Sequence, residues 1–351
     1  MSDHPRSIDG VWQEAARAYA DARLGTSRRA LEVHAGADFA VILTEMAELG
    51  FDLLCRSEAQ EGLAQDEFVL ASVLHALCTV DASVGAAVYA QGAAQLALRA
   101  VSDGSIPGTD LACAWIAWPA FHALGELVWP RLDEQGRLHG EVPMLLLGAH
   151  ARAAVLPARH DDALALVMVD LTAPGCVRSA PVRTLGLAAC GIVDLQLQAT
   201  PAHLLSAGAD QLLADLQRRL ALPAMAMFCG LMQGSLATAR DYSRQRHQGG
   251  GSLLGWGEVR RLLALMDERL AVATALFERH QQNEEVAVTA EHALLHTAAL
   301  ACELCCDGIQ LLGGNGYMRA SGQEKRWRDA WQLQSLGGSV AWRRQQLLPI
   351  T

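Results

Sequence analysis

Apolar residues at helical spacing dominate the N-terminal part of the chain. They return every three or four positions over 39–49 and 65–77, which predicts a helix in each segment. Another helix is predicted to begin at Asp81-Ala82-Ser83, because Asp81 or Ser83 can accept a hydrogen bond from the N–H groups of a first helical turn. We therefore assign residues 1–108 to an N-terminal helical domain.

The pattern then changes to short β-like runs. These runs cover 112–118, 137–142, 144–148, 163–171 and 192–198. Between them, Asp133-Glu134-Gln135-Gly136 has the composition of a hairpin turn. The prolines of this zone fall at or between strand edges, where a missing N–H is tolerated: Pro143, Pro157, Pro174 and Pro181. Residues 109–203 are predicted to form a small middle β domain.

Long helical patterns return in the last part of the chain. They run over 210–248, 258–282 and 286–312, separated by glycine clusters at 249–251 and 313–316. Residues 204–351 are therefore predicted to form a helical bundle. The fold class that follows is mainly α, with a small β domain between two helical regions.

Composition narrows the possible functions. The chain has 351 residues, of which 51% are hydrophobic and 19% charged, which is typical of a packed protein rather than a disordered one. Its formal net charge of −10 repels phosphate backbones, so nucleic acid is not an expected partner. Lys325 is its one lysine, which leaves little room for Schiff-base chemistry.

The chain gives no sign of export or membrane insertion. The N-terminus is polar and lacks an apolar core like that of a signal peptide. The apolar stretch 221–232 is too short to span a bilayer and contains Pro223 and Gly230. Nine cysteines without an export signal indicate free thiols. We expect a cytoplasmic protein.

Two groups of side chains have spacings that can suit a metal. Cys302, Cys305 and Cys306 share one helix face, and His292 and His296 lie one turn apart. No second ligand cluster pairs with the cysteines, and no glutamate completes a HExxH pattern. Buried cysteines and an ordinary helix face are the simpler interpretation, so no metal site is predicted. Trp115, Trp118 and Trp129 can line an acyl pocket or pack in the core.

The last third of the chain resembles the acyl-CoA dehydrogenase family. The segment 310–317 fits that family's QxxGGxGY motif, and Glu324 with Arg328-Asp329-Ala330 fits the ExxYRDA motif that follows. Upstream, 242–246 with Met266 fits the family helix YxxxRxxFG…Q…M. The resemblance extends over about residues 38–348. It implies an N-terminal helical domain, a middle β-barrel domain and a C-terminal four-helix bundle, the order found independently above.

The resemblance also implies a reaction. In the family, the ring of FAD lies against an acyl-CoA thioester, a glutamate removes the α proton and the flavin takes hydride from the β carbon. Each FAD site is built from two subunits. One holds the flavin ring with its middle domain and a C-terminal helix, and its neighbour holds the pyrophosphate and adenosine.

The residues that the resemblance assigns to the flavin ring are changed in this chain. The family's TEP motif falls on Ala117-Trp118-Pro119, so that Ala117 replaces a hydroxyl donor. The aromatic side chain that covers the ring becomes Met144, and a flavin-bonding Thr or Ser becomes Leu146. Losing a buried donor costs about 1–3 kcal/mol, so this half is expected to bind a ring poorly.

The resemblance leaves both known positions of the catalytic base without a carboxylate. The YEGT glutamate falls on Gly337, and the alternative base position, aligned through 230–233, falls on Leu220. We therefore predict no catalytic base. Four side chains remain open as substitutes, and sequence does not choose among them: Glu258, Glu303, His122 and His139.

The residues that face the neighbouring subunit are better preserved. Arg246 matches the arginine that meets the pyrophosphate, and Gln310, Gly313 and Gly314 match the turn that receives the adenosine. These four are the predicted cofactor-binding residues. Two other members of this half are missing, because the family Phe is Gly249 and the family Gln is Gly257.

This asymmetry predicts a subunit of a heteromeric FAD-dependent acyl-CoA dehydrogenase, in an arrangement such as α2β2. Family members of that kind are known in the bacterial degradation of steroid side chains, and fatty-acid or steroid substrates are suggested by that analogy alone. Three alternatives stay open. They are a homo-oligomer, a flavin-dependent non-oxidative acyl-CoA lyase, and a non-catalytic scaffold or regulatory paralogue.

Overall fold

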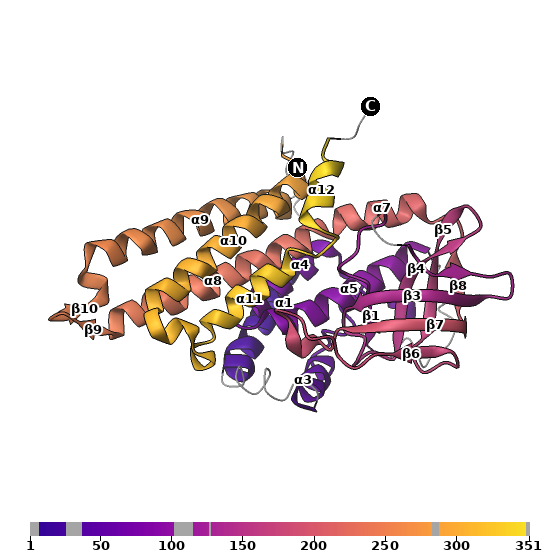
Figure 1. Ribbon diagram of the computed structural model, residues 1–351, viewed down its shortest axis with the longest axis horizontal. Helices are drawn as coiled ribbons and strands as arrows, with labels where there is room; N and C mark the ends of the chain where they lie inside the picture. The colour runs from indigo at the N-terminus through magenta and orange to yellow at the C-terminus, as the bar shows by residue number, and fades with distance from the viewer. Residues whose placement is uncertain (1–6, 26–36, 102–114, 126–127, 283–287, 349–351) are drawn as a thin grey trace.

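The computed structural model describes residues 7–25, 37–101, 115–125, 128–282 and 288–348. Figure 1 shows an elongated molecule with a curled β sheet at one end, long C-terminal helices reaching to the other end, and N-terminal helices against both. The predicted fold class, helical regions on either side of a small β domain, is confirmed.

The N-terminal region is helical, as predicted. Its elements are α1 (Ser7–Tyr19), the π-helical turn η1 (Ala20–Leu24), α3 (Ala37–Glu48), η2 (Glu58–Gln60), α4 (Glu67–Cys78) and α5 (Ala82–Val101). The side chain of Asp66 caps α4 by accepting from the N–H groups of Phe68 and Val69 at 3.0 and 3.1 Å. Asp81 accepts from the N–H of Ser83 at 2.8 Å, as the sequence suggested for the start of α5.

The middle region is a mixed β sheet whose strand order departs repeatedly from the sequence order. Its strands are β1 (Ile116–Ala117), β2 (Arg131–Leu132), β3 (Arg137–Leu145), β4 (Ala153–His160), β5 (Ala163–Asp170), β6 (Cys176–Arg178), β7 (Val193–Pro201) and β8 (His203–Ser206). The order is β6-β7-β3-β2-β4-β5-β8, and β1 pairs with β4 in parallel. The predicted turn at 133–136 joins β2 to β3.

Two strand predictions need correction. The run 137–142 and the start of the run 144–148 form one strand, because β3 continues through Pro143 to Leu145 with a register shift between Val142 and Leu145. There the N–H of Met144 donates to the side chain of the β7 residue Asp194 at 2.8 Å. Strand β4 was not predicted, since it is buried on both faces over most of its length and shows no alternation. Residues 112–114 of the first run lie outside the described residues.

The C-terminal region is a helical bundle. Its elements are α7 (Asp210–Arg219), α8 (Ala221–Gln245), β9 (His247–Gln248), β10 (Gly251–Ser252), η4 (Leu253–Gly255), α9 (Gly257–Gln281), α10 (Ala290–Leu312), η5 (Gly313–Tyr317), η6 (Arg319–Ser321), α11 (Gln323–Leu333) and α12 (Val340–Gln346). The predicted helix 210–248 is interrupted at Leu220. Pro223 then lies in the first turn of α8, where its missing N–H is not needed.

Helix α8 is the centre of the molecule, packing against α4, α9 and α10. Its glycines permit a close crossing with α4, since a Cβ on Gly230 or Gly234 would come within 2.2 or 1.9 Å of the carbonyl oxygen of His75 or Thr79. The boundary predicted at 108/109 lies outside the described residues. The one predicted at 203/204 falls within β8, and the domain limits stay a prediction.

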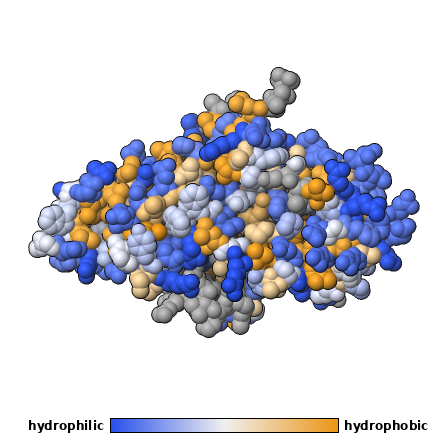
Figure 2. Space-filling view, viewed as in Figure 1, coloured by the Kyte–Doolittle hydropathy of each residue, from blue (hydrophilic) through white to orange (hydrophobic). Residues whose placement is uncertain are grey.

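Two helical stretches, Asp210–Gln245 and Ala290–Tyr317, are long and apolar enough to cross a membrane by length and composition. The sequence judgement that the longest apolar segment is too short was therefore wrong about length. The most apolar windows of these stretches are 89% and 61% buried inside the protein, which is the position of core helices. Figure 2 shows hydrophilic side chains over most of the visible face, with smaller hydrophobic areas between them.

His75 of α4 makes the stability of this core dependent on pH. Its ring stacks on Phe277 at 5.8 Å, and its Nδ1 atom is buried without a hydrogen-bond partner. Burial, with a smaller contribution from Arg17, lowers the pKa of His75 from 6.5 to about 4. As the pH falls, His75 therefore becomes protonated near pH 6.5 in the unfolded chain but only near pH 4 in the folded chain.

We expect up to about 3 kcal/mol of stability to be lost as the pH falls from 6.5 to 4, and His75→Phe to remove that part of the pH dependence. Urea unfolding followed at several pH values measures it. His203→Phe, at an exposed position, is the matched control and should keep the wild-type profile. An H75F variant with an unchanged pH profile would contradict this account.

Candidate functional site

The structure brings both predicted base positions to one internal cavity. Gly337, which follows α11, and Leu220, between α7 and α8, line this cavity together with Tyr89 of α5 and the loop Trp118-Pro119. The cavity measures only about 40 Å³. Sites for small-molecule ligands usually measure about 300–1,000 Å³, so this space holds little more than water.

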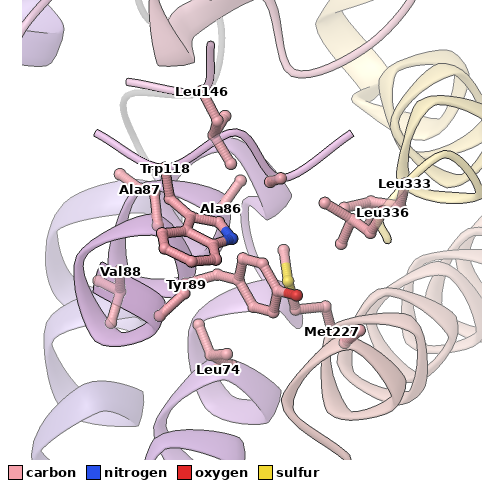
Figure 3. Packing of buried hydrophobic residues seen from close by; sticks show 14 of the residues in the cluster. Leu74, Ala86, Ala87, Val88, Tyr89, Trp118, Leu146, Met227, Leu333 and Leu336 are labelled. Atoms are coloured by element: carbon pink, nitrogen blue, oxygen red, sulfur yellow. The ribbon is translucent and has the colours of Figure 1, made fainter. Parts of the chain in front are cut away.

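Large apolar side chains fill the space around this cavity. Trp118 and Leu146 lie on adjacent backbone segments, joined by hydrogen bonds between their own N–H and C=O groups at 3.2 and 3.4 Å. Figure 3 shows the Trp118 indole beside the Tyr89 ring, with Met227 close to that ring and Leu336 nearby. The resemblance assigns flavin-bonding hydroxyls to positions 117 and 146. Because Ala117 precedes Trp118 in the chain, it lies close to Leu146, and both side chains are apolar and buried.

The loop that carries Gly337 is held in place by polar contacts. The N–H of Gly337 donates to the carbonyl oxygen of Ala120 at 2.7 Å, and Gln217 Nε2 donates to the carbonyl oxygen of Gly337 at 3.3 Å. Next to it, buried Arg343 of α12 donates to Glu291 Oε1 at 2.6 Å and to the carbonyl oxygen of Leu336 at 2.8 Å. Such a pinned loop cannot open the cavity without breaking several hydrogen bonds.

Glu291 is the carboxylate at this cavity, and sequence reasoning missed it. It lies in the first turn of α10, in no family motif, so no sequence signal pointed to it. Its side chain forms an ion pair with the Arg343 guanidinium at 2.6 Å. The cavity therefore has a carboxylate, but Arg343 already engages it.

The four open substitutes for the base are scattered. Only His122 lines the cavity, and its Nε2 is 2.8 Å from the carbonyl oxygen of Pro143. His139 pairs with Asp133 at 2.7 Å on the middle sheet, and this contact lowers the pKa of the Asp133 carboxyl. Glu303 pairs with Arg269 at 3.0 Å on the bundle surface, and Glu258 lies in a different cleft.

That second cleft gathers all four residues predicted to bind the cofactor. Arg246, Gln310, Gly313 and Gly314 line an open cleft of about 540 Å³ where α8 and α10 end, near the outer tip of the bundle (Figure 1). The backbone N–H of Arg246 donates to the carbonyl oxygen of Tyr242 at 2.8 Å, which fixes the end of α8. Their role in binding stays a prediction, but the structure places them together.

The cleft has the chemistry of a site for a phosphorylated ligand. The Arg246 side chain is exposed, and the described residues offer its guanidinium no recorded hydrogen bond or ion pair. Gly313 and Gly314 leave the turn open, since a Cβ on either would meet nothing within 4 Å. Asn315 Nδ2 donates to the Tyr242 hydroxyl at 3.0 Å and ties the turn to α8.

Glu258 is the unfavourable charge in this cleft. Arg261, one turn further along α9, donates to it at 2.6 Å, and this hydrogen bond lowers the pKa of the Glu258 carboxyl. Glu258 is therefore ionised and paired with Arg261, which offsets its repulsion of an anionic ligand. The residues present fit the pyrophosphate and adenosine part of FAD, whereas the internal cavity does not fit a flavin ring.

Comparison with known proteins supports the resemblance found in the sequence. Residues 216–348, less than half of the chain, match the model of the acyl-CoA dehydrogenase C-terminal domain. The chain is similar to the acyl-CoA dehydrogenase family over this C-terminal region. It is 24% identical over 217 residues to a probable acyl-CoA dehydrogenase, YngJ, of Bacillus subtilis, and 32% identical over 117 residues to a short-chain-specific acyl-CoA dehydrogenase of Clostridium acetobutylicum.

The sequence matches cover only part of each chain. The Bacillus match spans 57% of this chain and 56% of the relative, and the Clostridium match spans 32% and 30%. Solved structures extend the likeness in fold to nearly the whole chain. Butyryl-CoA dehydrogenase from Megasphaera elsdenii has a TM-score of 0.82 at 17% identity, covering 99% of this chain and 100% of that one.

Glutaryl-CoA dehydrogenase from Mycobacterium smegmatis has a TM-score of 0.85 at 16% identity, covering 99% of this chain and 96% of that one. At such identities the acyl-CoA dehydrogenase fold is what these structures establish. The resemblance to acyl-CoA dehydrogenases and the fold predicted from sequence are therefore confirmed. The activity of this chain has to be argued from its own residues.

No metal site emerges from the geometry. Among the described residues, no group of three His, Cys, Asp or Glu side chains is placed to hold a metal ion. Cys302 and Cys305 are buried in α10, and Cys306 is exposed. Gln334 Nε2 lies 2.9 Å from the sulfur of Cys302, and burial raises the pKa of that thiol to about 12. Cys302 and Cys305 have the packing of core residues.

Proposed function

We propose that this chain is one subunit of a hetero-oligomeric FAD-dependent acyl-CoA dehydrogenase. In this arrangement it lends its open cleft to the FAD of a partner subunit, and the partner supplies the ring pocket and the catalytic glutamate. The observation that carries the proposal is the contrast between the two sites, a cavity of about 40 Å³ beside Gly337 against an open cleft of about 540 Å³ beside Arg246.

The residues of this chain would bind the pyrophosphate and adenosine part of FAD. Arg246 offers a guanidinium charge for the pyrophosphate, Gln310 offers an amide, and the Gly313-Gly314 turn lets the backbone approach closely. FAD bound in a complete site accepts hydride from the β carbon of an acyl-CoA thioester while a carboxylate removes the α proton. Neither Gly337 nor Leu220 provides that carboxylate.

The internal cavity supports the partner requirement. A flavin ring would have to displace Trp118, Tyr89 and Leu146, which are packed in the core. The loss of two hydroxyl donors, at Ala117 and Leu146, would weaken a ring further by about 1–3 kcal/mol for each buried group left unpaired. The same argument counts against an acyl-CoA lyase that carries its own FAD.

Cytoplasmic location and a fatty-acid or steroid acyl-CoA substrate are parts of the same proposal. The location rests on the described cysteines, which are free thiols, and on the burial of the apolar helices. The substrate class rests on the family resemblance alone.

The flavin content per chain tests the proposal. Purified alone, the chain should carry little FAD and oxidise no acyl-CoA, whereas co-expression with a glutamate-bearing homologue from a neighbouring gene should give a complex with flavin and activity. Absorbance near 450 nm and oxidation by an artificial electron acceptor provide the two measurements. Full flavin occupancy of the lone chain would overturn the proposal, and an inactive, flavin-free complex with each candidate partner would favour a scaffold.

A further inference from the structure

An exposed tryptophan stands at the edge of the cleft. Trp256 comes directly before α9, and its side chain is 48% exposed although it is one of the largest apolar groups in the chain. Its indole Nε1 donates to the carbonyl oxygen of Gln248 at 3.2 Å, and Gln248 lines the cleft. The ring is therefore held in one orientation beside the cleft instead of moving freely in solvent.

The backbone next to this ring is arranged to admit it. Gly249 and Gly250 form the two-residue turn between β9 and β10, with φ values of +66° and +94° that favour glycine. A Cβ on Gly249 would lie 2.9 Å from Cζ2 of Trp256. A side chain at position 249 and the indole of Trp256 therefore exclude each other.

Position 249 is the one where the family resemblance places a phenylalanine. The geometry indicates an exchange, in which the aromatic surface is supplied from residue 256 on the other side of the hairpin. A flat ring held against Gln248, which lines the same cleft as the Arg246 guanidinium, suits a ligand with a planar base and negative charges. Stacking of a base on an aromatic side chain contributes about 1–3 kcal/mol, which is enough to matter in an open site.

We propose that Trp256 stacks on the adenine ring of the partner's FAD, at the rim of the cleft that Gln248 lines together with Arg246 and the Gly313-Gly314 turn. This inference rests on the proposed function above and adds a residue that determines preference for a purine nucleotide. The competing role for Trp256 is contact with the protein surface of the partner, and the test separates the two.

The test follows nucleotide binding to the isolated full-length chain. The chain is labelled with 5-fluorotryptophan, and the ¹⁹F resonance of Trp256, one of eight tryptophans, is assigned with a Trp256→Phe variant. ADP at up to millimolar concentration should shift this resonance, whereas inorganic pyrophosphate should leave it in place. If ADP fails to shift it, the inference is overturned, and a shift produced only by the partner subunit would assign the ring to protein contact.

Affinity gives the second readout. Trp256→Leu should weaken ADP binding by about 5- to 150-fold, which corresponds to the stacking energy at 1.4 kcal/mol per tenfold, and Trp256→Phe should keep most of the affinity. Trp331→Leu is the matched control, because Trp331 is 47% exposed on α11 and packs against Trp327 instead of the hairpin that carries Gln248. Equal ADP affinity of W256L and wild type would overturn the inference.

The two proposals can fail separately. A co-expressed pair that gains flavin and activity while W256L keeps its nucleotide affinity would refute the role of Trp256 and leave the proposed function in place. Absence of flavin in every pair would refute the proposed function, even where the lone chain still stacks ADP on Trp256.

Discussion

Replacing Lys325 by methionine is expected to lower the free energy of unfolding by about 3–5 kcal/mol, because it would leave two buried carboxylates without a counter-charge. The Lys325 ammonium of α11 lies 2.6 Å from Asp329 Oδ2, 3.1 Å from Asp81 Oδ1 and 3.3 Å from Ser83 Oγ. All four residues are buried. Thermal and urea unfolding, followed by circular dichroism, measure the loss.

The cluster joins three parts of the chain. Asp81 and Ser83 belong to the N-terminal region, Lys325 and Asp329 belong to α11, and Asp329 Oδ1 accepts from the N–H of Leu187 in the middle region at 2.7 Å. Burial raises the pKa of the Asp329 carboxyl, and the Lys325 charge opposes that effect. A neutral residue at position 325 would therefore weaken the contacts among the N-terminal region, the middle region and α11.

A charge-matched variant keeps this prediction testable. Lys325→Met combined with Asp81→Asn and Asp329→Asn removes the unpaired charges and should recover much of the lost stability. Arg218→Met, which removes an exposed ion pair with Asp215, should change stability by less than about 1 kcal/mol. If K325M unfolds at the same urea concentration as wild type, the cluster is not a junction of the fold.

This cluster explains why the sequence identified the family so well. Asp329 belongs to the Arg328-Asp329-Ala330 motif and Asp81 to the predicted helix start Asp81-Ala82-Ser83, and the structure shows them bound to one lysine. These motif residues hold regions of the fold together and do not face either candidate site. A resemblance to a family can therefore be detected from residues that stabilise the fold, because these residues are retained even when the active site changes.

Some elements of the structure were missed in the sequence analysis for physical reasons. Strand β4 is buried on both faces, so its residues show no period of two. The helix break at Leu220 places Pro223 in the first turn of α8, and the packing of α8 determines where that break falls. Among site residues, Glu291 and Arg343 meet across a long sequence separation, and no motif announces such a pair.

The candidate cleft was predictable because its residues lie in two short motifs. Arg246 ends one helix, and Gln310 with the glycine turn ends another, so the family pattern fixed their types and spacing. Trp256 was not predictable in that way, since its relation to Gly249 depends on the hairpin that brings the two together. A single sequence does not reveal that an aromatic side chain at position 256 occupies the space of one at position 249.

In the co-expressed complex, Arg246→Gln is expected to weaken FAD binding by about 10- to 150-fold. A hydrogen bond to a charged group contributes about 1.5–3 kcal/mol, and 1.4 kcal/mol corresponds to a tenfold change in affinity. The loss should appear as a flavin content per complex that falls on gel filtration, and as weaker FAD binding to the stripped complex by calorimetry. Since Arg246 is exposed, folding should be unaffected.

Arg244→Gln is the matched control for this prediction. Arg244 lies two residues earlier at the end of α8, is also exposed, and pairs with Asp241 at 3.3 Å instead of lining the cleft that holds Arg246. It should leave the flavin content and FAD affinity of the complex unchanged, because a general loss of positive charge at the bundle tip acts weakly at physiological salt. Equal weakening by R244Q and R246Q would mean that the tip attracts FAD by overall charge, and that the cleft does not hold its pyrophosphate. A flavin retained by R246Q with wild-type affinity would place the nucleotide outside this cleft altogether.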